Sequence, residues 1–249
     1  MQLTPSVVRL TFSVPGFRST GMADEWVHIF LGEPGDHRDR RNYTIRAVRG
    51  EEVDVDVVLH DRGLMVDWAT TARPGATLVW GDLTGSYAPP ADTAWQLLAG
   101  DITALPAIGR IVEELAPGVR ATVIAEVPAE ADRQAWESAG DVRVVWLRPG
   151  LLAGAVCAFP EPTGMGYRWM AAETRVVRMV RRHLRHERGI PRERYSLTGY
   201  WLDRFEEWAA RYAAIAEEMA AIWSRGQAEG RDEEEIMDEY EAALDRAGL

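Results

Sequence analysis

The segment Arg41-Asn42-Tyr43-Thr44-Ile45-Arg46 decides how this chain is interpreted. Side chains of a strand alternate between its two faces, and we expect Arg41, Tyr43 and Thr44 to present a guanidinium, a ring and a hydroxyl side by side on one face. A flavin dinucleotide needs these three groups: its pyrophosphate binds a guanidinium, its isoalloxazine an aromatic face and its N5 a hydroxyl. Any half-exposed barrel strand shows a similar alternation of polar and aromatic residues, so the interpretation depends on the rest of the sequence.

The first half of the chain alternates short apolar segments with turn signals, as an antiparallel barrel does. Val53-Asp-Val-Asp-Val57 is a nearly pure period-two segment, which predicts that Asp54 and Asp56 face water. We expect a barrel domain over residues 1–90. Its predicted strands cover residues 6–14, 26–31, 42–48, 53–60 and 76–80, with one helix over 65–71.

After the turn-rich stretch 84–92, strands alternate with helices, which predicts a mostly parallel α/β sheet covered on both faces. We place this domain at residues 91–202. Its predicted strands cover 95–99, 121–125, 142–146, 167–171 and 195–200, and its helices cover 105–115 and 173–187. The remaining residues, 203–249, carry apolar side chains at spacings of three and four. We expect them to form two amphipathic helices that pack back on the core or make a homodimer contact.

Composition excludes several functional classes. The net charge of -11 argues against broad nucleic-acid binding. No apolar run is long enough for a membrane span and the N-terminus lacks the layout of a secretory signal, so we expect a cytoplasmic protein. The single cysteine, Cys157, excludes an internal disulfide and a cysteine-cluster metal site. His183 and His186 have helical spacing but no evident third ligand, so we expect no metal.

Every fixed positive charge in the chain is an arginine, because the sequence contains no lysine. An anion site must therefore be built from arginine, histidine or backbone amides. Eight arginines fall between Arg175 and Arg194, while the last twenty residues are strongly acidic. The basic segment either offers a rim to an anionic substrate or pairs with the acidic terminal helices.

The loop Gly100-Asp101-Ile102-Thr103-Ala104-Leu105-Pro106 follows a predicted buried strand. We expect a tight turn that leaves backbone amides free at a helix N-terminus, where a dinucleotide pyrophosphate would sit, although an ordinary strand-to-helix turn has the same composition. Glu126 ends the next strand, and a carboxylate there favours a ribose hydroxyl over a 2′-phosphate. This predicts NADH rather than NADPH as the nucleotide.

Four strings, in order along the chain, resemble the siderophore-interacting proteins, which are flavin-dependent ferric-siderophore reductases on the ferredoxin-reductase-like fold. The strings are residues 41–46, Asp56-Val-Val-Leu-His60, Leu98-Ala-Gly-Asp-Ile-Thr-Ala-Leu-Pro-Ala-Ile108 and Tyr195-Ser-Leu-Thr-Gly-Tyr-Trp201. The resemblance implies that electrons pass from NADH or NADPH through FAD to a ferric siderophore, whose ferrous product escapes the chelator.

The resemblance also implies roles for particular residues. Tyr43 and Thr44 would be catalytic and would bind FAD together with Arg41 and Arg46. The other cofactor-binding residues implied by the family motifs are His60 and Gly63 on the flavin side, Gly100, Asp101, Thr103 and Pro106 on the nicotinamide side, and Trp169 and Glu173 beside both rings. Trp201 covers the flavin or, equally well, packs between the sheet and the terminal helices. Arg204 would face the anionic siderophore.

The chain departs from the family pattern at three places. After Gly63 the family usually has Pro-Ala-Ser, but this chain has Leu64-Met65-Val66. Ala172 precedes Glu173 where the family usually has a glycine, and Leu202 stands where the family has an arginine. These changes keep two alternatives open. The fold could be recruited to a non-redox role, such as a cyclase in a biosynthetic pathway, or it could be a non-catalytic interaction module that uses the terminal helices.

Overall fold

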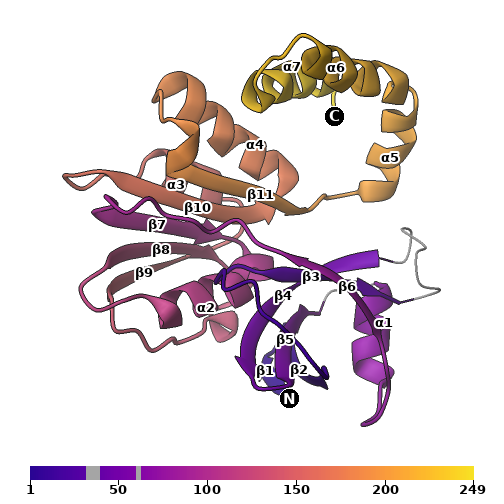
Figure 1. Ribbon diagram of the computed structural model, residues 1–249, viewed down its shortest axis with the longest axis vertical. Helices are drawn as coiled ribbons and strands as arrows, with labels where there is room; N and C mark the ends of the chain where they lie inside the picture. Colours follow the sequence, from indigo (N-terminus) through magenta and orange to yellow (C-terminus); the bar gives the residue numbers. More distant parts are fainter. Residues whose placement is uncertain (32–39, 60–62) are drawn as a thin grey trace. The chain divides into compact units, whose positions relative to one another are not determined.

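The computed structural model divides into two compact units, Met1–Tyr200 and Trp201–Leu249 (Figure 1). It describes residues 1–31, 40–59 and 63–249. The first unit contains two sheets, one antiparallel and one mostly parallel, and the second unit is helical. The expected domain boundary between residues 90 and 91 falls in the connection between the two sheets of the first unit and stays a prediction.

Six antiparallel strands form the first sheet in the order β1-β2-β5-β4-β3-β6. The strands are β1 (Gln2–Thr4), β2 (Val7–Ser13), β3 (Trp26–Phe30), β4 (Arg40–Arg49), β5 (Glu52–Val58) and β6 (Val79–Thr84). Alternate side chains of the central strands, among them Val27, Ile45 and Val55, are fully buried. Helix α1 (Leu64–Thr71) adds Met65 to the same core. The antiparallel barrel layer is therefore confirmed, whereas the short strand β1 was not predicted.

The prediction that the aspartates of β5 face water is wrong. Asp54 and Asp56 are 2% and 3% exposed. Strand β5 lies between β2 and β4, and each of these two strands contributes an arginine that pairs with an aspartate of β5. Arg9 donates to the Asp56 carboxylate at 2.6 and 2.8 Å, and Arg49 donates to that of Asp54 at 2.8 and 2.9 Å. A carboxylate can be buried when it is paired with an arginine in this way. A period-two pattern therefore shows that a strand has two different faces, but it does not show which of them is exposed to solvent.

The second sheet has the strand order β11-β10-β7-β8-β9, and β10, β7, β8 and β9 are parallel. The strands are β7 (Trp95–Gly100), β8 (Arg120–Glu126), β9 (Asp141–Leu147), β10 (Gly166–Glu173) and β11 (Tyr195–Trp201). Helix α2 (Leu105–Glu114) packs on one face, and α3 (Leu152–Cys157) and α4 (Thr174–Arg182) pack on the other (Figure 1). A π-helical turn, His183–Glu187, extends α4. The mostly parallel, doubly covered sheet is confirmed; helix α3 was not predicted.

The second unit holds three helices rather than the two expected. They are α5 (Phe205–Ala213), α6 (Ala216–Ala228) and α7 (Glu233–Arg246). The chain leaves helical geometry at Ile215, with φ -120° and ψ 6°, but the apolar spacing continues across this break and so does not reveal it. Met219, Ile222 and Ile236 form the centre of this unit's own core. Asp232 caps α7 by accepting from the amides of Glu234 and Glu235 at 2.8 and 3.1 Å.

Candidate functional site

The buried end of the 41–46 segment is tied to helix α2 of the second sheet. Arg46 is 6% exposed, and its guanidinium donates to both carboxylate oxygens of Glu113 at 2.6 and 2.7 Å. The carbonyl oxygen of Ile45 accepts a hydrogen bond from Nη1 of Arg110 at 3.0 Å. The same Nη1 donates to the buried carboxylate of Glu25 at 2.9 Å. Arg46 therefore connects the two sheets, because its guanidinium makes a bidentate ion pair with a carboxylate of the protein.

Thr44 connects the same segment to β11. Its side chain is buried and lies near the hydroxyl of Tyr200, whose pKa is raised by burial, so that the phenol stays neutral. Tyr43 and Thr44 are consecutive and therefore point to opposite faces of β4. The prediction that Arg41, Tyr43 and Thr44 share one face is thus wrong: Thr44 faces the α/β layer, while Tyr43 packs against the barrel core.

Arg41 and Tyr43 present the ligand-binding chemistry of this segment. Arg41 is exposed, and its guanidinium donates to the carbonyl of Arg40 at 2.8 Å. Tyr43 is half-buried, and burial raises its pKa to about 12. No described residue hydrogen-bonds to its hydroxyl. An exposed guanidinium beside a neutral aromatic ring suits the pyrophosphate and the isoalloxazine of FAD, so these two residues fit that cofactor.

Trp169 is a packed residue of the interface between the sheets. It is 1% exposed, and its indole N–H donates to Asp24 at 2.8 Å. The Asp24 carboxylate also accepts from the Ser86 amide and hydroxyl at 2.9 and 2.7 Å and from the Tyr87 amide at 2.9 Å. The Trp169 ring meets Tyr200 edge to face at 6.5 Å. The indole therefore has no open face for a ligand, and it acts here by holding Tyr200 in place.

Four of the predicted cofactor-binding residues, Gly100, Asp101, Thr103 and Glu173, come together at the carboxyl ends of β7 and β10. Oδ1 of Asp101 accepts from the amide of Thr103 at 2.9 Å and its hydroxyl at 2.5 Å, and Oδ2 accepts from the amide of Glu173 at 2.9 Å. The Glu173 carboxylate caps α4 by accepting two amide hydrogen bonds at 2.7 and 3.1 Å. A Cβ on Gly100 would stand 2.6 Å from the carbonyl oxygen of Ala171, so the two strand ends can approach only because residue 100 is glycine.

The prediction of free amides at the start of α2 is wrong for the amides that precede Pro106. The amide of Thr103 is bonded to the Asp101 carboxylate and that of Ala104 to the Asp101 carbonyl at 3.0 Å. The amide of Leu105 is bonded to a carbonyl of the 3-10 turn. Pro106 has no N–H and is buried in the first turn. The Asp101 side chain thus supplies the negative charge that the sequence led us to expect from a phosphate.

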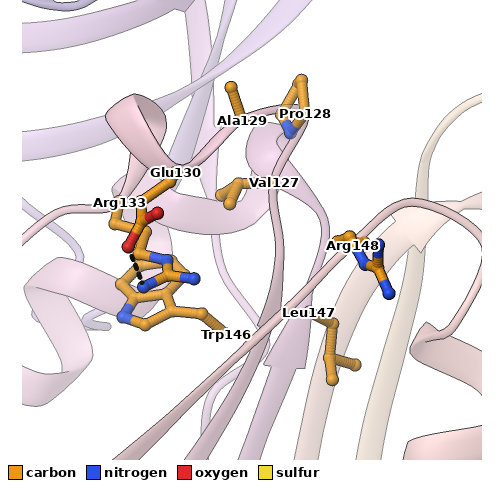
Figure 2. A pocket seen from close by; sticks show the side chains of 8 residues that line it. All are labelled: Val127, Pro128, Ala129, Glu130, Arg133, Trp146, Leu147 and Arg148. Carbon is orange, nitrogen blue, oxygen red and sulfur yellow. Dashed lines mark hydrogen bonds and ion pairs between the residues drawn. The ribbon is translucent and has the colours of Figure 1, made fainter.

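Glu126 ends β8 as predicted, but its carboxylate is engaged. Oε2 accepts from the amides of Leu151 and Leu152 at 3.0 and 2.9 Å, which caps α3. Beside it lies a hollow of about 210 Å³ at the carboxyl ends of β8 and β9 (Figure 2). The lining residues are Val127, Pro128, Ala129, Glu130, Arg133, Trp146, Leu147 and Arg148.

The other predicted residues are not brought into this arrangement. His60 lies outside the described residues. Gly63 precedes α1, whose first turn replaces the family's Pro-Ala-Ser. Trp201 and Arg204 belong to the second unit, so their place at the site stays a prediction. Arg204 is exposed, has φ 50° and lies 3.6 Å from Glu207.

Sequence reasoning missed the residues that hold the two sheets together. Tyr200 belongs to the segment 195–201 that resembles a family motif, and this position in the motif could have indicated a role at the site. Asp24 and Glu25 are adjacent acidic residues before an apolar strand, a pattern that indicates a solvated loop. Arg110 and Glu113 sit on a helix whose other residues are mostly apolar, and nothing in their spacing indicates partners far away in sequence.

Comparison with known proteins agrees with this architecture. The model of the siderophore-interacting FAD-binding domain matches residues 32–86, and that of the siderophore-interacting protein matches residues 93–204. The ferric vibriobactin reductase ViuB of Vibrio cholerae is 31% identical over 177 residues, which cover 65% of this chain and 64% of ViuB.

Two solved structures are similar over most of their length. A siderophore utilization protein from T. fusca has 28% identity and a TM-score of 0.71 over 82% of this chain and 90% of that one. A ferredoxin NADP+ reductase from Neisseria gonorrhoeae, with bound FAD and NADP, has a TM-score of 0.60 over 80% of this chain and 94% of that one. At 13% identity the second structure shows the fold alone. Within the described residues, no helix is long and apolar enough to cross a membrane.

Proposed function

We propose that this chain, which belongs to the siderophore-interacting protein family, is an FAD-dependent oxidoreductase that passes electrons from NADH or NADPH to a ferric siderophore. Two family models support this, one of them for an FAD-binding domain, as does similarity to a protein named ferric vibriobactin reductase. The observation that carries the proposal is the anchoring of two consecutive residues of β4, Ile45 and Arg46, to α2 of the second sheet. Nicotinamide-to-flavin electron transfer requires such fixed alignment of the two layers.

Arg41 and Tyr43 are the residues that would hold the cofactor. Arg41 would pair with the pyrophosphate, and the neutral Tyr43 ring would lie against an aromatic or ribityl part of FAD. Bound FAD would accept two electrons together and release them singly to ferric iron. The buried Thr44 hydroxyl and the Tyr200 phenol, whose pKa burial raises, are both neutral, so they can orient a polar atom at the layer boundary without adding charge.

The two alternatives receive no support from a described feature. The first turn of α1, where the sequence departs from the family, places Met65 in the barrel core at 2% exposure. That departure is therefore compatible with an ordinary, well-packed barrel. The helical unit Trp201–Leu249 has its own core, and a homodimer through it stays a prediction.

The test is an absorption spectrum of the purified chain after incubation with FAD and removal of excess cofactor. Anaerobic addition of NADH or NADPH should bleach the flavin band, and a ferric catecholate should restore it while a ferrous-specific chromophore develops colour. Arg41→Ala should weaken FAD binding, whereas Arg18→Ala, which removes an exposed arginine of the same unit, should not. A protein that takes up no FAD, or holds flavin that neither nucleotide reduces, would refute the proposal.

A further inference from the structure

We infer that the hollow at the carboxyl ends of β8 and β9 holds the adenosine 2′-phosphate of NADPH, and that Arg133 and Arg148 select NADPH over NADH. The inference rests on the proposed function, because it specifies which nicotinamide nucleotide is the electron donor. It reverses the preference that Glu126 led us to expect from the sequence.

The location and size of the hollow suit one end of a dinucleotide. Open parallel sheets bind ligands outside the carboxyl ends of their strands, and the hollow lies where β8 and β9 end. The amide of Val127 donates to the carbonyl of Leu147 at 3.1 Å, so the two strands stay paired up to its wall. Its volume of about 210 Å³ is below the roughly 300 Å³ at which pockets for whole ligands begin. It can therefore take the adenosine end while the rest of the nucleotide runs along the sheet edge.

Two guanidinium groups against one carboxylate give the hollow a positive balance. No described residue makes a hydrogen bond or an ion pair with Arg148. All N–H groups of its guanidinium are therefore available to a phosphate. Arg133 pairs with Glu130 at 2.9 Å, but these side chains are 45% and 82% exposed. An exposed pair of this kind contributes little, so a doubly charged phosphate can compete for Arg133 while Glu130 turns to water. Figure 2 shows Arg133 and Arg148 on opposite sides of the hollow.

The carboxylate that would favour NADH is partly engaged. Glu126 uses Oε2 to cap α3 through two amide hydrogen bonds, which fixes the carboxylate toward the helix end and leaves Oε1 alone for a ribose hydroxyl. Trp146 supplies the remaining chemistry: its ring lines the hollow and packs against Trp136 at 5.6 Å, so it is held as a surface on which adenine can stack.

The loop that carries Arg133 is anchored from the other sheet. Asp132 is 1% exposed, and its carboxylate accepts from the Thr4 hydroxyl at 2.9 Å and from the Ser6 amide and hydroxyl at 2.9 and 3.1 Å. The 3-10 turn Glu130–Asp132 is thereby fixed immediately before Arg133. A loop that is ordered before the ligand arrives costs less to bind, which is the property expected of a specificity-determining loop.

The test uses adenosine 2′,5′-diphosphate and 5′-AMP as probes, because the two molecules differ only in the 2′-phosphate. Calorimetric titration of the full chain, with or without FAD, should show tighter binding of the diphosphate. Arg133→Ala and Arg148→Ala should each weaken the diphosphate about ten- to hundredfold and leave 5′-AMP within about threefold. Arg120→Ala is the matched control, since it removes an exposed arginine at the opposite end of β8. Circular dichroism of each variant checks folding.

The outcomes separate this inference from the proposed function. Equal affinity for both probes, no binding of either, or an equal loss in Arg120→Ala would overturn the NADPH site, even where NADH reduces the flavin. Conversely, the protein could bind the diphosphate selectively while neither NADH nor NADPH reduces its flavin. That result would support the 2′-phosphate site and refute the proposed reductase activity. In a working reductase, NADPH should reduce the flavin faster than NADH at equal low concentration, and Arg148→Ala should remove that difference.

Discussion

Replacing Arg110 by methionine tests whether the contact between the two sheets depends on a buried ion pair. Arg110 is 7% exposed on α2 and makes three charge-assisted hydrogen bonds. It donates to Glu25 at 2.9 Å, to the carbonyl of Ile45 at 3.0 Å and to Glu114 at 2.7 Å. Methionine keeps the unbranched stem and the helix propensity of arginine, so the substitution removes mainly the charge and these bonds.

The expected loss in the free energy of unfolding is about 3–5 kcal/mol, the usual cost of removing one partner from a buried ion pair. Glu25 is 0% exposed, so its carboxylate stays buried with only the hydroxyl and amide bonds from Ser19 and Thr20. Glu25→Gln in the same background removes that uncompensated charge. The double variant should therefore be more stable than the sum of the two single losses by about 1–3 kcal/mol.

Urea unfolding followed by tryptophan fluorescence measures these free energies for the single and double variants. Arg120→Met, an exposed arginine at the start of β8, is the control and should change stability by no more than about 0.5 kcal/mol. A loss below about 1 kcal/mol for Arg110→Met, or strict additivity with Glu25→Gln, would refute the view that the pair joins the two sheets.

Three further predictions follow from the same interface. Asp24→Asn should lower the free energy of unfolding by about 1–3 kcal/mol in a urea titration, because an amide cannot accept from all the donors around it and leaves one, such as the indole N–H of Trp169, without a partner. Gly100→Ala should lower the melting temperature by several degrees, because its Cβ would stand 2.6 Å from the carbonyl oxygen of Ala171. Burial opposes ionisation of Glu25, but hydrogen bonds from its hydroxyl, amide and arginine donors hold its pKa below the ordinary 4.5. Its contribution to stability is therefore present above pH 4.5 and lost as the pH falls through the folded pKa, and in Arg110→Met this loss should begin at a higher pH.

Matched control variants distinguish these effects from a loss of stability that any substitution would cause. Asp82→Asn removes an exposed carboxylate of β6 and should leave the urea midpoint unchanged. Gly154→Ala places a Cβ in open space inside α3 and should stabilise the protein by up to about 1 kcal/mol. If Asp24→Asn behaves like Asp82→Asn, or if Gly100→Ala raises the melting temperature as Gly154→Ala should, the packing described here is incorrect. A Glu25→Gln variant whose stability has the same acid dependence as the parent would contradict the pH prediction.

Most elements of the first unit could be predicted from sequence because their apolar residues follow simple patterns. The valines of β5 recur at every second position, and β7 and β8 are mostly apolar runs, as in strands buried on both faces. Strand β1 and helix α3 were missed, since three and six residues are too few to show a period. The exposure of Asp54 and Asp56 was predicted wrongly because their partners, Arg9 and Arg49, come from neighbouring strands whose order is not visible in the sequence.

The sequence indicated which residues lie at the candidate site, but it did not indicate what each side chain does there. Asp101, Glu126 and Glu173 each stand at the carboxyl end of a strand, where a ligand-binding carboxylate would stand. Each carboxylate accepts hydrogen bonds from backbone amides at the start of a helix or turn. Sequence cannot distinguish the two uses, because a helix N-terminus attracts a side-chain carboxylate and a ligand phosphate by the same field.

The segment 41–46 shows where that ambiguity is resolved. Arg46 and Arg41 are the same residue type five positions apart, yet one is buried against a carboxylate and the other is exposed at the start of the strand. The buried arginine cannot leave Glu113 for a phosphate without stranding a charge between the sheets, a cost of several kcal/mol. The exposed one is not held in a buried ion pair, and its guanidinium donates to the carbonyl of Arg40 at the surface. Cofactor affinity should therefore depend on Arg41 directly, and on Arg46 only through the alignment of the two layers.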